Sequence, residues 1–181
     1  MIVVGVLWDY TSFLEAALFP HPAQSSPTPP RSSFDDADLD AAVAGVLTSK
    51  FQVNGQSCLC ANRIFVQDAI AADFTDRLTK AVSQLKVGFG TEDGVDIGPL
   101  INDQGFDKVS AHVADAVAKG AKVETGGGRV EALTGGYFFE PTVLSGCTDD
   151  MLCASDETFG PVAPVLTFES ESEVIERANA S

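Results

Sequence analysis

The sequence predicts an α/β fold with three layers, in which helices flank a largely parallel sheet. From residue 36 onward, segments with apolar residues at helical spacing alternate with short strand-like runs, which is typical of such a sheet. The chain has 181 residues, of which 45% are hydrophobic and 20% charged. That length and composition are enough to bury the core of one globular domain.

The first 33 residues differ from the rest of the chain. Five of the nine prolines lie between Pro20 and Pro30, a composition typical of an extended linker. A Pro-x-x-Pro match ends this stretch, but such matches are common in any Pro-rich linker. We therefore expect residues 1–33 to be a flexible Pro/Ser-rich segment and residues 34–181 to form the folded domain.

Four helices are expected, each with one apolar stripe. The first begins near Asp36, with acidic residues in its first turn. The third has Asn102 as a candidate N-cap and ends at Gly120, and the last opens with a capping box from Ser170 to Glu173. The stripes of the first three are Leu39, Ala42, Val43, Val46 and Leu47; Phe74, Leu78, Val82 and Leu85; and Phe106, Val109, Val113 and Val117.

Strand-like runs are expected at 64–66, 121–124, 138–144 and 164–168. Two glycine-rich segments, 88–94 and 126–129, could be mistaken for phosphate-binding loops. The first follows a helix and carries acidic residues, and no helix opens after the second. Both are therefore interpreted as plain loops.

Charge and cysteine content exclude several classes of function. The formal net charge of −15 disfavours binding to nucleic acid or to an anionic membrane surface. No apolar run is long enough to span a membrane, and the N-terminal run lacks the basic start of a signal peptide. Four cysteines in a chain of this length do not indicate a disulfide framework, so we expect a reducing, cytoplasmic location.

Cys58 is the candidate nucleophile. It follows Gly55 in a loop between a helix and the strand-like run at 64–66, where a thiol could attack a carbonyl and backbone N–H groups could hold the resulting oxyanion. Taken alone, the local sequence is equally compatible with a buried structural cysteine. A redox contact with Cys60 stays open. A zinc site is not expected, because Cys147 and Cys153 lack matching spacing and a nearby histidine.

Five ordered motifs carry a resemblance to a known family. They are the run from Phe34 to Val43, Gly55-Gln56-Ser57-Cys58, Gly98-Pro99-Leu100-Ile101, Glu140-Pro141-Thr142-Val143-Leu144 and Glu157-Thr158-Phe159-Gly160-Pro161-Val162. Together they resemble the aldehyde dehydrogenase family over residues 34–181. The resemblance implies that these residues form part of its catalytic domain. Cys58-Leu59-Cys60-Ala61-Asn62-Arg63 is most similar to the succinate-semialdehyde dehydrogenase branch.

The resemblance also implies roles for individual residues. Cys58 would be the catalytic nucleophile, Glu157 would bind the ribose hydroxyls of an NAD or NADP cofactor, and Phe159 would pack near the nicotinamide ring. From the residues alone, Glu157 could equally be a solvated loop acid and Phe159 a core residue. Two positions depart from the branch: Gln52 replaces an arginine that pairs with the substrate carboxylate, and Val53 replaces an asparagine.

The implied activity is oxidation of a small aldehyde, with succinate semialdehyde as a candidate, through a thiohemiacetal and a thioester on Cys58. We find no segment that resembles the family's dinucleotide-binding domain, its general base or its oxyanion asparagine. We therefore expect the isolated chain to be inactive. The alternatives are a non-catalytic interaction fragment, in which a homo-oligomer would form through apolar surface and open strand edges, and a thiol-dependent esterase.

Overall fold

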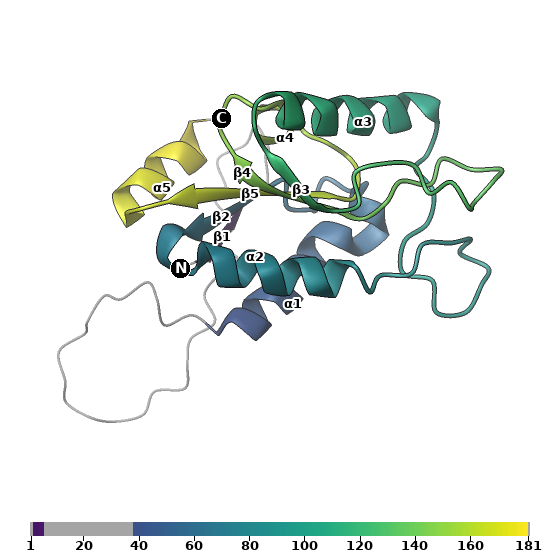
Figure 1. The fold of residues 1–181 in the computed structure, drawn as a ribbon, viewed down its shortest axis with the longest axis horizontal. Helices are drawn as coiled ribbons and strands as arrows, with labels where there is room; N and C mark the ends of the chain where they lie inside the picture. Colours follow the sequence, from purple (N-terminus) through teal and green to yellow (C-terminus); the bar gives the residue numbers. More distant parts are fainter. Residues whose placement is uncertain (1, 6–37, 181) are drawn as a thin grey trace.

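The computed structural model describes residues 2–5 and 38–180. Within them, helices and strands alternate along most of the chain (Figure 1). The elements are β1 (Ile2–Gly5), α1 (Leu39–Phe51), the 3-10 helix η1 (Gln52–Gly55), β2 (Arg63–Gln67), α2 (Asp68–Val82), α3 (Asp103–Ala118), β3 (Lys122–Thr125), β4 (Thr142–Cys147), α4 (Leu152–Ser155), β5 (Val162–Phe168) and α5 (Glu171–Asn179).

The five strands form one sheet in the order β1-β2-β5-β4-β3. The two central pairings, β2 with β5 and β5 with β4, are parallel. The outer strands β1 and β3 are antiparallel to their neighbours. The predicted α/β class is confirmed, since a mostly parallel centre is covered by helices on both faces. The antiparallel edges were not predicted, because strand-like composition does not specify direction.

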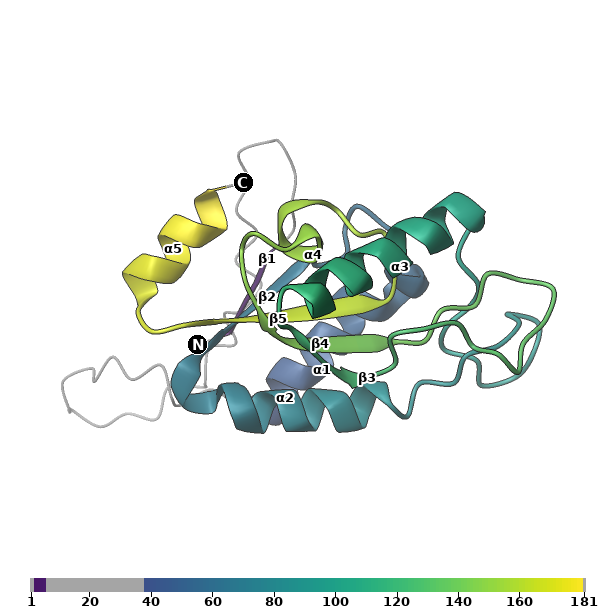
Figure 2. The same cartoon turned by 45° about the horizontal axis from the view of Figure 1, so that its top comes forward.

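The sheet separates two apolar cores. On β2, Ile64 and Val66 face the core that α1 and α2 cover, whereas Phe65 faces the core that α3 and α4 cover. Alternation with a period of two residues is the geometry of any strand, and here both faces are buried. Figures 1 and 2 show the resulting layers, with α3 on one side of the sheet and α1 and α2 on the other.

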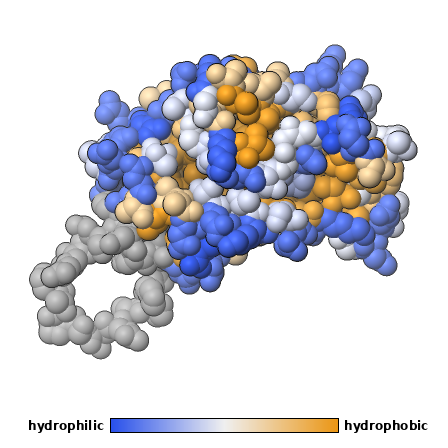
Figure 3. Space-filling model, viewed as in Figure 1, coloured by the Kyte–Doolittle hydropathy of each residue, from blue (hydrophilic) through white to orange (hydrophobic). Residues whose placement is uncertain are grey.

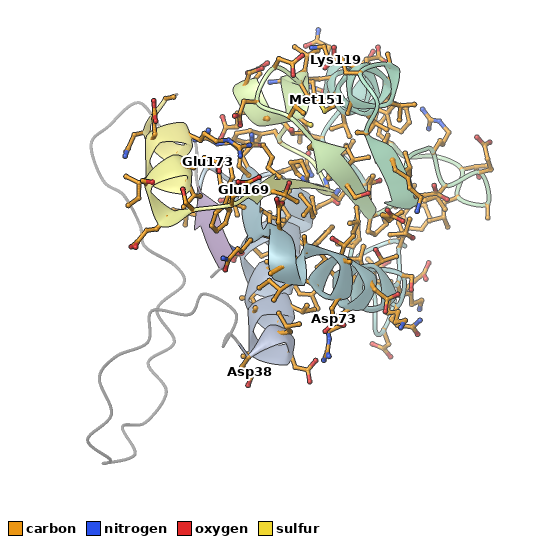
Figure 4. The ribbon with its side chains drawn as sticks, turned by 60° about the vertical axis from the view of Figure 1, so that its left-hand side comes forward. Asp38, Asp73, Lys119, Met151, Glu169 and Glu173 are labelled. Carbon is orange, nitrogen blue, oxygen red and sulfur yellow. The ribbon has the colours of Figure 1, made fainter. Side chains whose placement is uncertain are left out.

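Side-chain caps begin three of the long helices. Asp38 accepts hydrogen bonds from two backbone N–H groups at the start of α1. The predicted cap Asn102 accepts from the Gly105 N–H at 2.8 Å at the start of α3, and Ser170 accepts from the Glu173 N–H at 3.3 Å. Figure 4 shows Asp38 at the start of α1, and Glu173 close to Glu169, whose N–H it accepts at 2.9 Å. These contacts satisfy donors that have no partner inside the helix.

The apolar stripe of α3 differs from the prediction at one position. Val109 and Val113 are buried as expected, but Val117 is 47% exposed. His112 is buried in the same face instead, at 3% exposure. The helical period allows either residue, and burial of the imidazole is favoured here because it finds polar partners on a neighbouring loop.

The described N-terminal residues form the edge strand β1, whose backbone pairs Ile2 with Val66 and Gly5 with Arg63. No strand was predicted within the flexible segment. The proline-rich residues 20–30 and the predicted domain boundary at residue 34 lie outside the described residues. The division into residues 1–33 and 34–181 therefore stays a prediction.

The surface mixes polar and apolar regions, and Figure 3 shows apolar patches bordered by hydrophilic residues on the face of Figure 1. None of the helices among residues 38–180 is long and apolar enough to cross a membrane. In the same part of the chain, no group of three His, Cys, Asp or Glu side chains is arranged to hold a metal ion.

Candidate active site

A sharp reversal of the backbone follows α1 and creates the loop that carries Cys58. Val53, Asn54 and Gly55 have φ angles of 48°, 59° and 69°, all in the left-handed region. The chain therefore turns back at once instead of extending the helix. This bears out the predicted tight turn before the cysteine, although three residues share it rather than Gly55 alone.

Two amide side chains fasten this reversal to the 98–101 segment. The Asn54 amide donates to the Gly98 carbonyl at 2.9 Å. Gln56 accepts from the Ile101 N–H at 2.9 Å and donates to the Pro99 carbonyl at 3.3 Å. Two of the sequence motifs, 55–58 and 98–101, are thereby brought into contact. The asparagine expected at position 53 is absent, and Asn54 stands one position later. Asn54 is buried, and its side chain holds the reversal against the 98–101 segment.

The loop exposes one cysteine and buries the other. A turn closed by the Cys60 N–H and the Ser57 carbonyl at 2.9 Å places Cys58 at its tip, where it is exposed. Cys60 is 5% exposed, and its thiol donates to the Gln52 carbonyl at 3.4 Å. Burial raises the pKa of the Cys60 thiol, although the Ser57 backbone and the Lys50 charge oppose this. Only Cys58 of this pair is open to a reactant.

The segment that carries Glu157 and Phe159 packs directly against the Cys58 loop. A Cβ atom added to Gly55 would lie 2.2 Å from the Gly160 carbonyl oxygen, so the two backbones touch and only glycine fits at position 55. Phe159 has a φ angle of 50° and is 39% exposed, and Glu157 is half-buried. The structure therefore brings together the loop of Cys58 and the two residues that the sequence assigned to cofactor binding.

Two lysines hold positive charge near Glu157. Burial raises the pKa of the Glu157 carboxyl group, whereas Lys108 on α3 and Lys50 on α1 lower it and Asp156 raises it further. Lys50 is 1% exposed, and desolvation lowers its pKa from 10.5 to about 8 against the opposing effects of Cys60, Glu157 and Cys153. The two lysine charges thus partly offset the acidic groups of Asp156 and Glu157 at this end of the site.

Lys50 was missed in the sequence, although a signal existed. It lies four residues after Val46 and seven after Val43, on the buried stripe of α1. A lysine at a core position of a helix either extends its aliphatic stem so that the ammonium group reaches solvent, or keeps the ammonium group buried to interact with nearby residues. Its burial beside Cys60 and Glu157 favours the second.

The other two cysteines lie in the core on the α3 side. Cys147 and Cys153 are 4% and 0% exposed. Their thiols interact: a hydrogen bond with Cys153, together with burial, raises the pKa of Cys147. Neither thiol is accessible to solvent. A surface cavity of about 350 Å³ lies elsewhere, between α2 and the sheet, and shares no residue with the site.

Comparison with known proteins identifies similar sequences. The aldehyde dehydrogenase family model matches residues 32–181. Glutarate-semialdehyde dehydrogenase of Pseudomonas aeruginosa is 55% identical over 146 residues, which are 81% of this chain and 30% of that protein. Mitochondrial succinate-semialdehyde dehydrogenase of Rattus norvegicus is 52% identical over 149 residues, or 82% and 28% of the two chains. The NADP(+) succinate-semialdehyde dehydrogenase of Escherichia coli is 49% identical over 81% of this chain and 30% of its own length.

Solved structures agree with the fold. Succinate-semialdehyde dehydrogenase from Burkholderia pseudomallei superposes with a TM-score of 0.78 at 54% identity, over 82% of this chain and 30% of that one. The NAD+ complex of aldehyde dehydrogenase from Bacillus cereus gives a TM-score of 0.76 at 39% identity, over 81% and 30%. The chain thus spans about three tenths of the length of the relatives that it matches.

Proposed function

Because the chain belongs to the aldehyde dehydrogenase family, as its motifs predicted, we propose that it carries the reactive centre of an enzyme that oxidises an aldehyde to a carboxylic acid with NAD or NADP. The observation that carries this proposal is the exposed Cys58 at the tip of a loop whose neighbour is the Glu157–Phe159 segment. The names of relatives support the class of substrate, and the NADP(+) enzyme of Escherichia coli and the NAD+ complex of the Bacillus cereus enzyme support the class of cofactor.

In the proposed reaction, the Cys58 thiolate adds to the aldehyde carbon. A carbon–sulfur bond forms, and the electron pair of the carbonyl moves to its oxygen, where the Cys58 backbone N–H can hold it. A bound nicotinamide would supply the acceptor for the hydride that leaves the aldehyde carbon. Loss of that hydride leaves a thioester on Cys58, which water cleaves to release the acid and the thiol. Residues outside the described part would activate this water.

The residues of the 157–159 segment fit a nicotinamide nucleotide. A half-buried carboxylate at Glu157 can accept two hydrogen bonds from a ribose diol, and charge-assisted bonds of this kind fix orientation. Burial raises the pKa of Glu157, and the charges of Lys108 and Lys50 oppose that rise. The partly exposed Phe159 ring offers an apolar surface beside it. We therefore propose that Glu157 binds the ribose and that Phe159 packs near the nicotinamide ring.

For the substrate we propose succinate semialdehyde or a close homologue, which agrees with the names of the relatives. Gln52 is exposed close to Cys58 in sequence and can offer a neutral amide to a carboxylate. An amide donor forms a weaker bond than an arginine fork. We therefore expect weaker preference for a terminal carboxylate than an arginine would give.

The addition step can be tested without cofactor. Succinate semialdehyde labelled with ¹³C at the aldehyde carbon should form a thiohemiacetal with Cys58, detectable by NMR as a signal with the shift of a carbon bonded to sulfur and oxygen. Cys58→Ser should abolish the signal, and the matched variant Cys60→Ser should keep it. Equal signals from wild type and Cys58→Ser would contradict the proposal.

We expect no steady-state turnover from these residues alone. None of the residues described here is proposed to activate water, and Glu157 and Phe159 are proposed to bind only one end of the nucleotide. The purified chain should give no growth of reduced-nicotinamide absorbance above a Cys58→Ser control. Growth that requires Cys58 would contradict this part of the proposal.

A second candidate is a non-catalytic interaction fragment. Three apolar side chains near the site are strongly exposed: Val53 at 71%, Leu59 at 74% and Ile101 at 81%. Exposed apolar groups of this size favour association. Self-association that Leu59→Ser and Ile101→Ser reduce, in a chain that forms no adduct at Cys58, would favour this alternative.

A further inference from the structure

A buried polar chain connects α3 to the segment that carries Glu157. His112 Nδ1 lies 3.1 Å from the Thr158 hydroxyl, and His112 Nε2 lies 3.7 Å from the Asp156 carboxylate. The negative charge of the Asp156 carboxylate beside Nε2 favours a proton on that nitrogen, so we assign the neutral imidazole as the Nε2–H form. Nδ1 then accepts, and the Thr158 hydroxyl donates to it.

Asn62 braces the same segment from the other side. Its side-chain oxygen accepts from the Thr158 N–H at 3.1 Å. Its amide nitrogen donates to the carbonyls of Cys153 at 3.2 Å and Asp156 at 3.1 Å. One side chain therefore fixes the backbone both before and after Glu157.

His112, Asn62 and Thr158 form a brace that is almost completely buried. Thr158, His112 and Asn62 are 1%, 3% and 3% exposed. A buried donor or acceptor that loses its partner costs more than the bond itself contributes, because water cannot replace the partner. Gly160 closes the arrangement, since a Cβ atom there would lie 2.4 Å from a methyl group of Val109 on α3.

We infer that His112 and Asn62 are positioning residues, which hold Glu157 and Phe159 in place through Thr158. The inference rests on the proposed function for the role of Glu157 and Phe159, but the brace itself can be tested without any cofactor. His112 touches neither reacting atom in this scheme and acts only through the segment.

The brace has a dependence on pH. Protonation of Nδ1 below the pKa of His112 reverses its hydrogen bond with Thr158: Nδ1–H then donates to the Thr158 oxygen, and the Thr158 hydroxyl proton loses its acceptor. Burial lowers this pKa first, and Lys108 lowers it further, whereas Asp156 on the segment and Asp115 on α3 raise it. The segment should therefore be ordered near neutral pH and loosen in acid, below the ordinary histidine range.

NMR on the ¹⁵N-labelled chain tests the coupling. The His112 nitrogens should show the Nε2–H form at neutral pH, and the Phe159 amide should shift with the same midpoint as the ring. Thr158→Val keeps the size of the side chain and removes its hydroxyl. In that variant the His112 ring should still titrate, but the chemical shift of the Phe159 amide should no longer change at the pH midpoint of the ring. Persistence of that change would overturn the inference.

Three further variants separate positioning from simple stability. Lys108→Gln keeps the hydrogen bonds among His112, Asn62 and Thr158 but removes the Lys108–Asp156 ion pair at 3.4 Å and a charge that lowers the His112 pKa, so both midpoints should move upward together. His112→Phe should speed hydrogen exchange of the Thr158 amide about tenfold, as expected for one lost buried bond. His112→Asn, whose amide can reoccupy the Nδ1 position, should restore much of the protection.

Two results would overturn the brace: midpoints that move separately in Lys108→Gln, or exchange that is unchanged in His112→Phe. The cofactor role is tested apart from this by titrating the chain at neutral pH with nicotinamide mononucleotide, which carries the ribose and the ring that Glu157 and Phe159 are proposed to contact. Weaker binding in both Glu157→Gln and His112→Phe supports the link. Binding that is unchanged in Glu157→Gln would refute the proposed ribose contact but would not contradict the positioning role of His112 and Asn62.

Discussion

Val53 holds a backbone conformation that β-branched residues rarely adopt. Its φ of 48° crowds the branched side chain against its own backbone, and its 71% exposure means that little packing compensates. The strain sits five residues before Cys58, in the reversal that presents the thiol. Asparagine tolerates this conformation far better than valine.

Val53→Asn should therefore stabilise the chain. We expect the free energy of unfolding to rise by about 1 kcal/mol, since a strained left-handed residue costs about 1–3 kcal/mol. Urea unfolding followed by circular dichroism measures the change. Val53→Ala, which removes the branch and keeps a Cβ atom, should gain less. A loss of stability in Val53→Asn would show that the valine side chain makes a contact that outweighs its strain.

Lys50 gives stability a characteristic dependence on pH. The folded chain holds this ammonium with a pKa of about 8, whereas the unfolded chain keeps the ordinary value of 10.5. Between these values the unfolded chain binds a proton that the folded chain lacks. The contribution of Lys50 to stability therefore rises with pH across this window and is smallest below pH 8.

Lys50→Met, which keeps the length of the side chain without its charge, should remove this contribution. The free energy of unfolding at pH 7 should increase by about 3 kcal/mol at most, and the variant should gain less from alkali than wild type between pH 8 and 10. Urea unfolding at several pH values, with reductant present, gives both curves. Parallel curves would mean that Lys50 titrates normally.

Residues differ in how far sequence could predict them. Cys58, Glu157 and Phe159 stand in ordered motifs, so their proximity could be expected from resemblance. Lys50 and His112 each occupy one position of an otherwise apolar helix stripe. From periodicity alone, a polar residue at such a position is expected to be exposed. Their burial depends on Glu157, Thr158 and Asp156, which are far away in sequence. Such partners become visible only in the folded chain.

At the level of elements, two glycines decide how the Cys58 loop meets the 156–160 segment. Gly55 has no room for a side chain, because its Cβ direction points at the Gly160 carbonyl oxygen. Its φ of 69° is also strained for any other residue. The contact transmits the position of one motif to the other.

Gly55→Ala should separate these elements. Steric overlap at 2.2 Å and the left-handed backbone together should lower the free energy of unfolding by about 3 kcal/mol. Gly94→Ala is the matched control, since Gly94 has a similar φ of 72° with open space at its Cβ position. It should lose only about 1 kcal/mol. Equal losses in the two variants would show that the contact with Gly160 contributes nothing.

The elements themselves followed from local signals where those signals were strong. The N-caps of α3 and α5 and the buried faces of α1 and α2 were predicted from capping residues and spacing, and the structure bears them out. Strand limits shifted: the run expected at 138–144 yields β4 at Thr142–Cys147. Pairing partners decide where a strand begins, and a single segment does not contain them.

At the scale of the whole molecule, the fold sorts four chemically identical thiols. Three of them are buried: Cys60, Cys147 and Cys153 are 5%, 4% and 0% exposed. Cys58 is presented at the surface by elements that all belong to this chain. The central claim is that this fold makes Cys58 the reactive thiol of the domain.

Timed alkylation of the folded and unfolded chain tests that claim most directly. The protein is treated briefly with iodoacetamide at neutral pH, with and without urea, and each cysteine is quantified by mass spectrometry. In the folded chain, Cys58 should react at least about tenfold faster than each buried cysteine, because they must await local opening. In urea the four rates should converge. If Cys147 or Cys153 reacts first in the folded chain, or if all four react alike, the account of the nucleophile loop is wrong.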